Sequence, residues 1–188
     1  MSINRNRQDE KGNTKLHQLT QEDDYDNLVQ VIDAFKAKYS SVTRRAISTS
    51  LSTLVNVKNN EQKAGGRRPL HYARSDKVVR LLVENGSELD AQDSYGLTAL
   101  HIFVLQGQLS LVKTILRCGA SINIRCYKNC TFTNSEKYGL YNRNTVQLAA
   151  MTGMSCVHVS TCINVYIFVY HILPILTLTL TLIAFYPP

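Results

Sequence analysis

The amino-acid sequence predicts an all-α protein built from repeated helix-turn-helix units and followed by an apolar C-terminal segment. The first observation is a Leu-His dipeptide that recurs at residues 16, 70 and 100. The second is that apolar residues follow each dipeptide with the 3.6-residue period of a helix. The third is that the 21 Lys and Arg and the 14 Asp and Glu all lie before residue 144. A single domain of uniform composition is therefore excluded.

Residues 93–123 show the unit most completely. The unit opens with Asp93-x-x-Gly96-x-Thr98-Ala99-Leu100-His101. The Thr98 hydroxyl is suited to cap a first helix, because it accepts a hydrogen bond from an amide that has no partner within that helix. Gly107 predicts the turn that follows. The second helix then carries an apolar stripe of Leu111, Val112, Ile115 and Leu116. Gly119 comes where the end of a helix commonly needs a left-handed residue.

This unit resembles the ankyrin repeat, in which D-x-x-G-x-T-P-L-H is followed by a glycine turn, V-V-x-x-L-L and G-A-x-x-N. Partial copies begin near residues 9, 69 and 146. The resemblance implies a short solenoid of three to four units with hairpin-like loops, which binds other proteins without catalysis. It also implies that His17, His71 and His101, which share one repeat position, hold neighbouring hairpins and catalyse nothing.

The spacing of the copies divides the chain into six segments. They are a degenerate first repeat (1–37), a polar insert or linker (38–68), two repeats (69–125), an insert loop (126–143), a partial repeat (144–157) and an apolar tail (158–188). Within the 38–68 insert, Ile47, Leu51 and Leu54 have the spacing of one extra amphipathic helix. Gly65-Gly66-Arg67-Arg68 at its end indicates a flexible connector. Inserts in repeat proteins generally form loops.

The second repeat is compressed between its two helices. Leu70 and Leu100 lie 30 residues apart, whereas the repeat period is about 33. The unit Pro69-Leu70-His71-Tyr72-Ala73 ahead of Thr98-Ala99-Leu100-His101 is similar to the ankyrin region of calcium-independent, patatin-like phospholipases of type A. The G-x-S-x-G serine of that family is missing here. The resemblance implies an alternative to an independent binding protein: a truncated, ankyrin-only form of such a phospholipase, either regulatory or non-functional.

The apolar tail allows three interpretations. Residues 163–186 are long enough to cross a bilayer as a helix, and Lys128, Lys137 and Arg143 precede them. This arrangement predicts a cytoplasmic repeat domain anchored to a membrane by its C-terminus. Pro174 and the alternation of Leu and Thr after it argue against a regular helix. The second interpretation is an aberrant C-terminus foreign to the repeats, and the third is a buried cap on the last repeat.

No catalytic motif accompanies the repeats. The sequence contains no G-x-S-x-G, no G-x-x-x-x-G-K-[ST] and no H-E-x-x-H, so we expect no enzyme, no cofactor and no small-molecule substrate. Cys126 and Cys130 form one Cys-x-x-x-Cys pair, whereas structural zinc usually needs a second pair. We therefore expect free thiols and no metal. The net charge of +7 is scattered, unlike the basic cluster of a nucleic-acid-binding protein.

Candidate contact residues for an unidentified protein partner lie at the hairpin tip of the third repeat. They are Gln92, Ser94 and Tyr95. We expect their side chains to face solvent, and Tyr95 offers an aromatic anchor of the kind enriched at interfaces. The alternative, that these side chains only solvate the tip, stays open.

Overall fold

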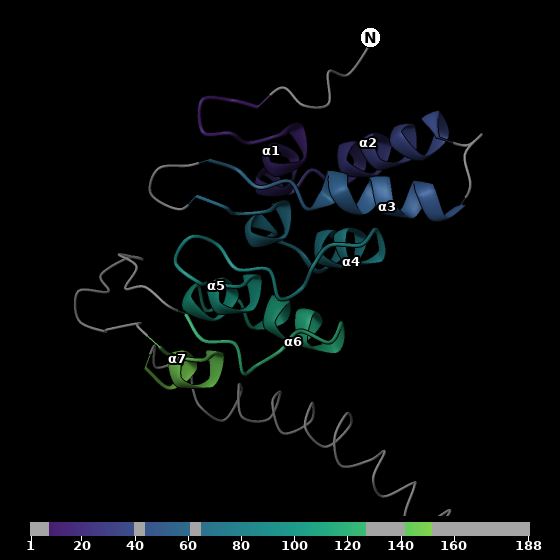
Figure 1. Ribbon diagram of the computed structural model, residues 1–188. Helices are drawn as coiled ribbons and strands as arrows, with labels where there is room; N and C mark the ends of the chain where they lie inside the picture. Colours follow the sequence, from purple (N-terminus) through teal and green to yellow (C-terminus); the bar gives the residue numbers. More distant parts are fainter. Residues whose placement is uncertain (1–7, 40–43, 61–64, 127–141, 152–188) are drawn as a thin grey trace, which may run out of the picture.

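The computed structural model describes residues 8–39, 44–60, 65–126 and 142–151. Their helices are α1 (Lys15–Glu22), α2 (Tyr25–Lys38), α3 (Arg44–Val55), the 3-10 helix η1 (Pro69–Tyr72), α4 (Asp76–Glu84), α5 (Ala99–Leu105), α6 (Leu109–Arg117) and α7 (Thr145–Met151). The helices stack in two rows, with the connecting loops along one side (Figure 1). The first row is α1, η1, α5 and α7, and the outer row is α2, α3, α4 and α6. For the described residues, the expected all-α architecture is confirmed.

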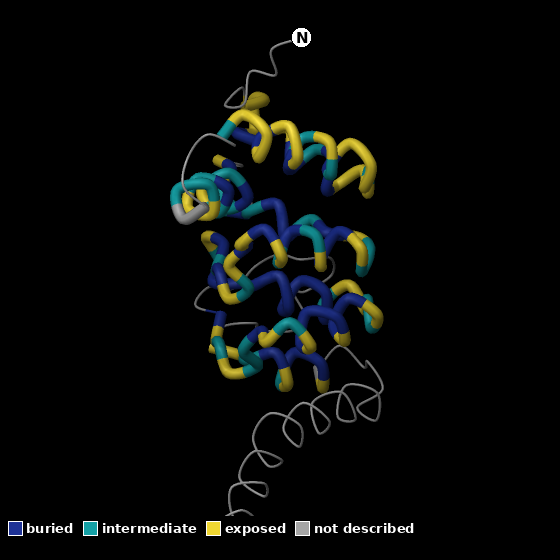
Figure 2. The backbone as a smooth tube through the Cα atoms, turned by 90° about the vertical axis from the view of Figure 1, so that its right-hand side faces the viewer, coloured by how far each residue is buried: buried dark blue, intermediate teal, exposed yellow. Residues whose placement is uncertain are grey.

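Apolar side chains fill the space between the two rows. Figure 2 shows buried residues running through the middle of the stack and exposed residues on its outward faces. The stripe expected on the second helix of the third repeat lies on α6, where Leu111, Val112, Ile115 and Leu116 are all buried. Phe103 of α5 is buried as well. Burial of one such side chain contributes about 1.5–3 kcal/mol, so the stripe fixes α6 against its neighbours.

The ends of α5 and α6 follow the sequence prediction. The Thr98 hydroxyl accepts a hydrogen bond from the backbone amide of His101, so it caps α5. Gly107 follows α5 with φ of 70°, and Gly119 follows α6 with φ of 98°. Glycine adopts this left-handed conformation without the steric cost that a Cβ atom brings.

Helix α3 is the extra amphipathic helix expected around Ile47, Leu51 and Leu54. It lies between α2 and α4 in the outer row (Figure 1), and Leu51 is buried. Side chains near its end also bond to the next loop, because Ser52 Oγ and Asn56 Nδ2 each donate to the carbonyl of Gly86, at 3.1 and 2.8 Å. The extra helix expected within the 38–68 insert is therefore confirmed, and it is packed into the outer row.

Each hairpin loop beside the first row contains a tight turn. In that turn the amide of a residue with positive φ donates a hydrogen bond to the carbonyl of an earlier residue. In the first loop the amide of Gly12 donates to the carbonyl of Asp9, and in the third loop the amide of Gly96 donates to the carbonyl of Asp93. Both glycines have positive φ, 75° and 82°. The D-x-x-G element of the sequence is thus the hairpin turn.

The second loop makes the same turn with different residues. The amide of Gly66 donates to the carbonyl of Asn59 at 2.9 Å, and the amide of Arg67 donates to Asn59 Oδ1 at 2.9 Å. Arg67 is buried. The interpretation of Gly65–Arg68 as a flexible connector is wrong, because these residues form the returning arm of a hairpin that packs against both neighbouring loops.

The fourth loop turns at Cys126 and Asn142. The Asn142 amide donates to the Cys126 carbonyl at 2.8 Å, and Asn142 has φ of 59°. Residues 127–141, most of the predicted insert, are outside the described residues. The helical part of the partial repeat is α7. The remaining segment boundaries stay predictions.

The described residues contain no helix whose length and apolar character would let it cross a bilayer. The predicted span, residues 163–186, falls outside them, as do Lys128, Cys130 and Lys137.

Candidate protein-interaction surface

Three buried histidines connect the first-row helices to the next hairpin loop. His101 shows the arrangement: its Nδ1 accepts from the Thr98 amide at 3.1 Å, and its Nε2 lies 3.0 Å from the carbonyl of Ile124. Because Nδ1 accepts from an amide, the proton of the neutral ring is on Nε2, which donates to that carbonyl. Burial lowers the pKa of His101 to about 4, since protonation would place a charge in the core and oppose the bond to the amide.

His17 and His71 repeat this geometry. His17 accepts from the Thr14 amide, and its Nε2 lies 3.1 Å from the Arg67 carbonyl. His71 accepts from the Arg68 amide, and its Nε2 lies 3.1 Å from the carbonyl of Ala91. Burial lowers the pKa of both rings. The structure thus supports the scaffold role implied for the three histidines.

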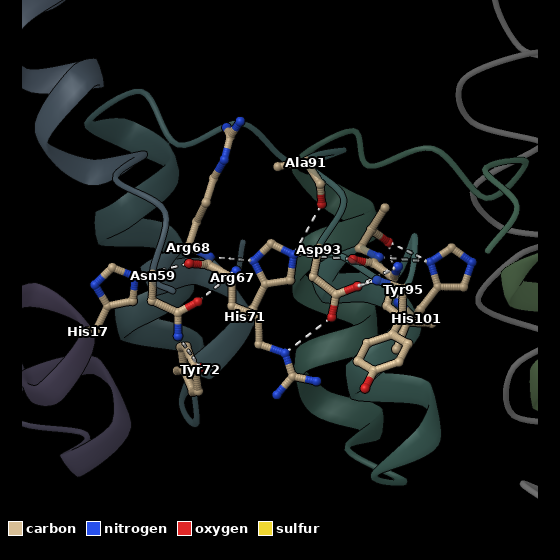
Figure 3. Close-up of polar contacts among 12 residues, drawn as sticks. His17, Asn59, Arg67, Arg68, His71, Tyr72, Ala91, Asp93, Tyr95 and His101 are labelled. Carbon is tan, nitrogen blue, oxygen red and sulfur yellow. Dashed lines mark hydrogen bonds and ion pairs between the residues drawn. The ribbon is translucent and has the colours of Figure 1, made fainter. Parts of the chain in front are cut away.

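A buried ion pair ties the second hairpin to the third. Arg67 Nε donates to Asp93 Oδ2 at 3.2 Å, and the Asp93 side chain is fully buried (Figure 3). The other carboxylate oxygen of Asp93 accepts from the amides of Tyr95 and Leu97, at 2.9 and 3.0 Å. One carboxylate therefore shapes its own hairpin tip and neutralises the cation of the neighbouring hairpin. The guanidinium of Arg67 also lies over the ring of Tyr72, 5.8 Å from its centroid.

The three predicted contact residues have different surroundings. Ser94 is exposed, and its amide donates to the carbonyl of Gly65 in the preceding loop at 2.8 Å. Tyr95 is half-buried and packs partly against the core. The Gln92 side chain donates to the carbonyls of Gly96 and Arg125, at 2.7 and 3.0 Å. Of the three, only Ser94 is as exposed as expected, and Gln92 joins two hairpins.

A polar hollow, which the sequence pattern does not predict, opens beside η1. Its volume is about 200 Å³, and its lining residues are Gln21, Arg67, His71, Tyr72, Ala73, Arg74 and Gln106. It is formed because η1 has four residues, whereas α1 and α5 on either side have eight and seven. The chain leaves the first row at Ala73, short of the ends of its neighbours. The three-residue compression was the available signal, but sequence spacing alone does not show that a hollow results.

Possible metal ligands and cysteine thiols occur in the part of the chain described. There, no cluster of three or more His, Cys, Asp or Glu side chains has the arrangement of a metal site. Cys118 and Cys126 are free thiols. Burial raises the pKa of both, which disfavours the reactive thiolate.

The repeated hairpin, the histidine bridge and the two rows of helices agree with comparisons to known proteins. Residues 44–126 match the family model described as ankyrin repeats, in three copies. The chain contains ankyrin repeats. Ankyrin repeats are protein-interaction modules, and the first-row helices and hairpin tips form the candidate contact surface here. Residues 9–38 lie outside the match, yet their hairpin and His17 have the same geometry as the later ankyrin repeats.

Proteins similar to this chain occur in different settings. Transient receptor potential cation channel subfamily V member 6 of Rattus norvegicus is 36% identical over 81 residues, 42% of this chain and 10% of the channel. A putative ankyrin repeat protein of Rickettsia bellii is 37% identical over 68 residues, 34% of this chain and 28% of that protein. The 85/88 kDa calcium-independent phospholipase A2 of Mus musculus is 35% identical over 50 residues, 27% of this chain and 6% of the enzyme. The chain thus matches only a small part of each relative.

Proposed function

We propose that this chain is a binding protein whose partner contacts the hairpin tip of the third ankyrin repeat and the adjoining surface of the first-row helices. The observation that carries the proposal is the fixed tip around Asp93, whose carboxylate accepts from the amides of Tyr95 and Leu97. A preformed tip binds at a smaller entropic cost than a loop that must first become ordered. Ser94 and Tyr95 are the contact residues, and Gln92 positions the tip through its bonds to two hairpins.

Replacing Tyr95 by alanine tests this surface. Peptides selected on the full chain from a displayed library of random sequences serve as the probe, and calorimetry measures their affinity. Tyr95→Ala should weaken binding about tenfold, because an aromatic anchor at an interface commonly contributes more than 1 kcal/mol. Ser94→Arg, which leaves the core untouched, should weaken the same peptides by blocking the tip.

Tyr25→Ala is the matched control, because Tyr25 is an exposed aromatic residue at the start of α2 in the outer row. Its affinity for the selected peptides should equal that of the unmodified chain. Equal affinities for the Tyr95→Ala and Ser94→Arg variants would refute the proposed surface.

We infer a second property, association of residues 163–186 with a lipid bilayer, from the absence of any Lys, Arg, Asp or Glu in this run. The cationic residues that precede it would keep the ankyrin repeats on the cytoplasmic side. The full chain expressed in cells should then resist extraction with alkaline carbonate, and deletion of residues 163–188 should release it. Complete extraction of the full chain would exclude an integral anchor.

The alternative function, an ankyrin-only form of a phospholipase, is no better supported than the independent binding protein proposed above. The repeats resemble 6% of the mouse phospholipase and 10% of the rat channel, so the activity of neither relative transfers to this chain. Mixing the chain with purified calcium-independent phospholipase would show the regulatory form as co-purification with a change in enzyme activity.

A further inference from the structure

The hollow beside η1 is a gap in the first row of helices with an unusual set of polar groups. Figure 3 shows the guanidinium of Arg67 and the ring of Tyr95 projecting in the same direction. Arg67 lines the hollow and also pairs with Asp93 of the third hairpin, so this arginine links the hollow to the hairpin assigned above to partner binding.

Positive and hydrogen-bond-donating groups dominate the lining. It has the guanidinium groups of Arg67 and Arg74 and the carboxamides of Gln21 and Gln106, and no carboxylate. Arg74, Gln21 and Gln106 are exposed. Guanidinium and carboxamide groups together offer several N–H donors to an incoming oxygen.

The neighbouring groups leave this positive character in place. His71 is neutral, because burial lowers its pKa, and its Nε2 faces the carbonyls of Ala91 and Leu97. The carboxylate of Asp93 is fully buried against Arg67. Asp23 is not among the lining residues, and its carboxylate accepts a hydrogen bond from Ser75 Oγ at 2.6 Å. Arg74 is thus the exposed cation available to a ligand.

The size of the hollow limits what can enter. One water occupies about 30 Å³ in the liquid, so a volume near 200 Å³ corresponds to about six or seven waters. A glutamate side chain has five heavy atoms, which leaves space for one or two bridging waters. A carboxylate also matches the planar guanidinium fork, which binds it through two parallel N–H···O bonds.

We propose that the hollow receives a glutamate side chain of the bound protein, with Arg74 as the principal donor and Gln21 and Gln106 completing the contacts. This inference rests on the proposed binding function and names the chemistry of the partner. The shortened first helix of the second repeat is then a specificity element.

The direct test uses the tripeptide acetyl-Gly-Glu-Gly-amide and the full chain. In NMR titrations, the side-chain amide signals of Gln21 and Gln106 should shift in a saturable way. The same peptide with Gln in place of Glu should bind at least tenfold more weakly, since hydrogen bonds between charged groups are about twice as strong as neutral ones. A phosphoserine tripeptide that binds tenfold more tightly than the Glu peptide would overturn the assignment to glutamate.

Variants of two exposed arginines supply the matched comparison. Arg74→Gln should weaken the Glu tripeptide about tenfold, the change expected for one charge-assisted contact. Arg80→Gln removes the same charge from α4, away from the hollow, and should leave the affinity unchanged. An equal response of the two variants, or no shift of the Gln21 and Gln106 signals, would overturn the proposal.

The displayed-peptide selection separates this inference from the proposed function. Selected peptides should carry Glu at one fixed position, and their affinity should fall with Arg74→Gln. Peptides that respond to Tyr95→Ala but not to Arg74→Gln would uphold the binding surface and overturn the glutamate site. In the opposite case, the Glu tripeptide binds the hollow while the affinity of the selected peptides is unchanged by Tyr95→Ala and Ser94→Arg. That result would uphold the glutamate site and refute docking at the hairpin tip.

Discussion

Replacing Asp93 by alanine should lower the free energy of unfolding by about 3–5 kcal/mol, the range for breaking a buried ion pair. The substitution leaves Arg67 buried without its carboxylate and removes the acceptor for the amides of Tyr95 and Leu97. Total stability of a small protein is about 5–15 kcal/mol, so a large share of it is at stake. Urea unfolding followed by circular dichroism measures the change.

Asp93→Asn separates the charge from the hydrogen bonds. Asn59 already closes the second hairpin with its amide oxygen, so asparagine at residue 93 should retain the turn while it loses the charge. Its destabilisation should be smaller than that of Asp93→Ala. Adding Arg67→Met to Asp93→Asn should cost less than the sum of the two single changes, because no unpaired charge remains. Additive losses would contradict an ion pair that contributes to folding.

Acidification should destabilise the protein between pH 6.5 and 4 through its buried histidines. The unfolded histidine titrates near 6.5, and burial lowers the pKa of folded His101 to about 4. In this interval the unfolded chain binds more protons, so stability falls as the pH falls. By linkage, the lowered pKa of His101 alone reduces the free energy of unfolding by about 2 kcal/mol at pH 5. His17 and His71 change it in the same direction. Urea midpoints measured from pH 7 to pH 4.5 test this expectation.

His101→Gln is the control for acid sensitivity. Gln147 occupies the equivalent position in the first turn of α7, where its Oε1 accepts from the Asn144 amide at 3.2 Å. Glutamine can therefore take over the acceptor role of the imidazole without titrating. The variant should lose less stability than the unmodified chain between pH 7 and pH 5. Parallel pH profiles for the two proteins would show that His101 does not cause the effect.

Much of the repeat architecture was predictable because local patterns encode it. The cap at Thr98, the positive φ of Gly107 and Gly119 and the buried stripe on α6 all depend on residues close together in the sequence. The extra helix around Leu51 was predictable for the same reason.

The roles of Asn59, Arg67 and Gln92 were not predictable, because each depends on a different loop. The sequence pattern places Arg67 in a connector, yet its side chain pairs with a carboxylate 26 residues away. Gln92 was expected at a solvated tip, yet it donates to the carbonyl of Arg125 in the following loop. Asn59 lacks the D-x-x-G spacing, since Gly66 comes seven residues later. Only the folded loops show that Asn59 and Gly66 form the same turn as Asp93 and Gly96.

The sequence has Lys, Arg, Asp and Glu before residue 144 and none after it, which marks a tail unlike the repeats. The ankyrin units and the compression of the second one can also be predicted from the sequence, because the repeat period and the glycine positions depend on residues close together in the chain. The consequence of that compression is visible in the folded protein alone. Placed between α1 and α5, the short η1 exposes Arg74 beside two carboxamides, since a hollow is created by neighbours in space.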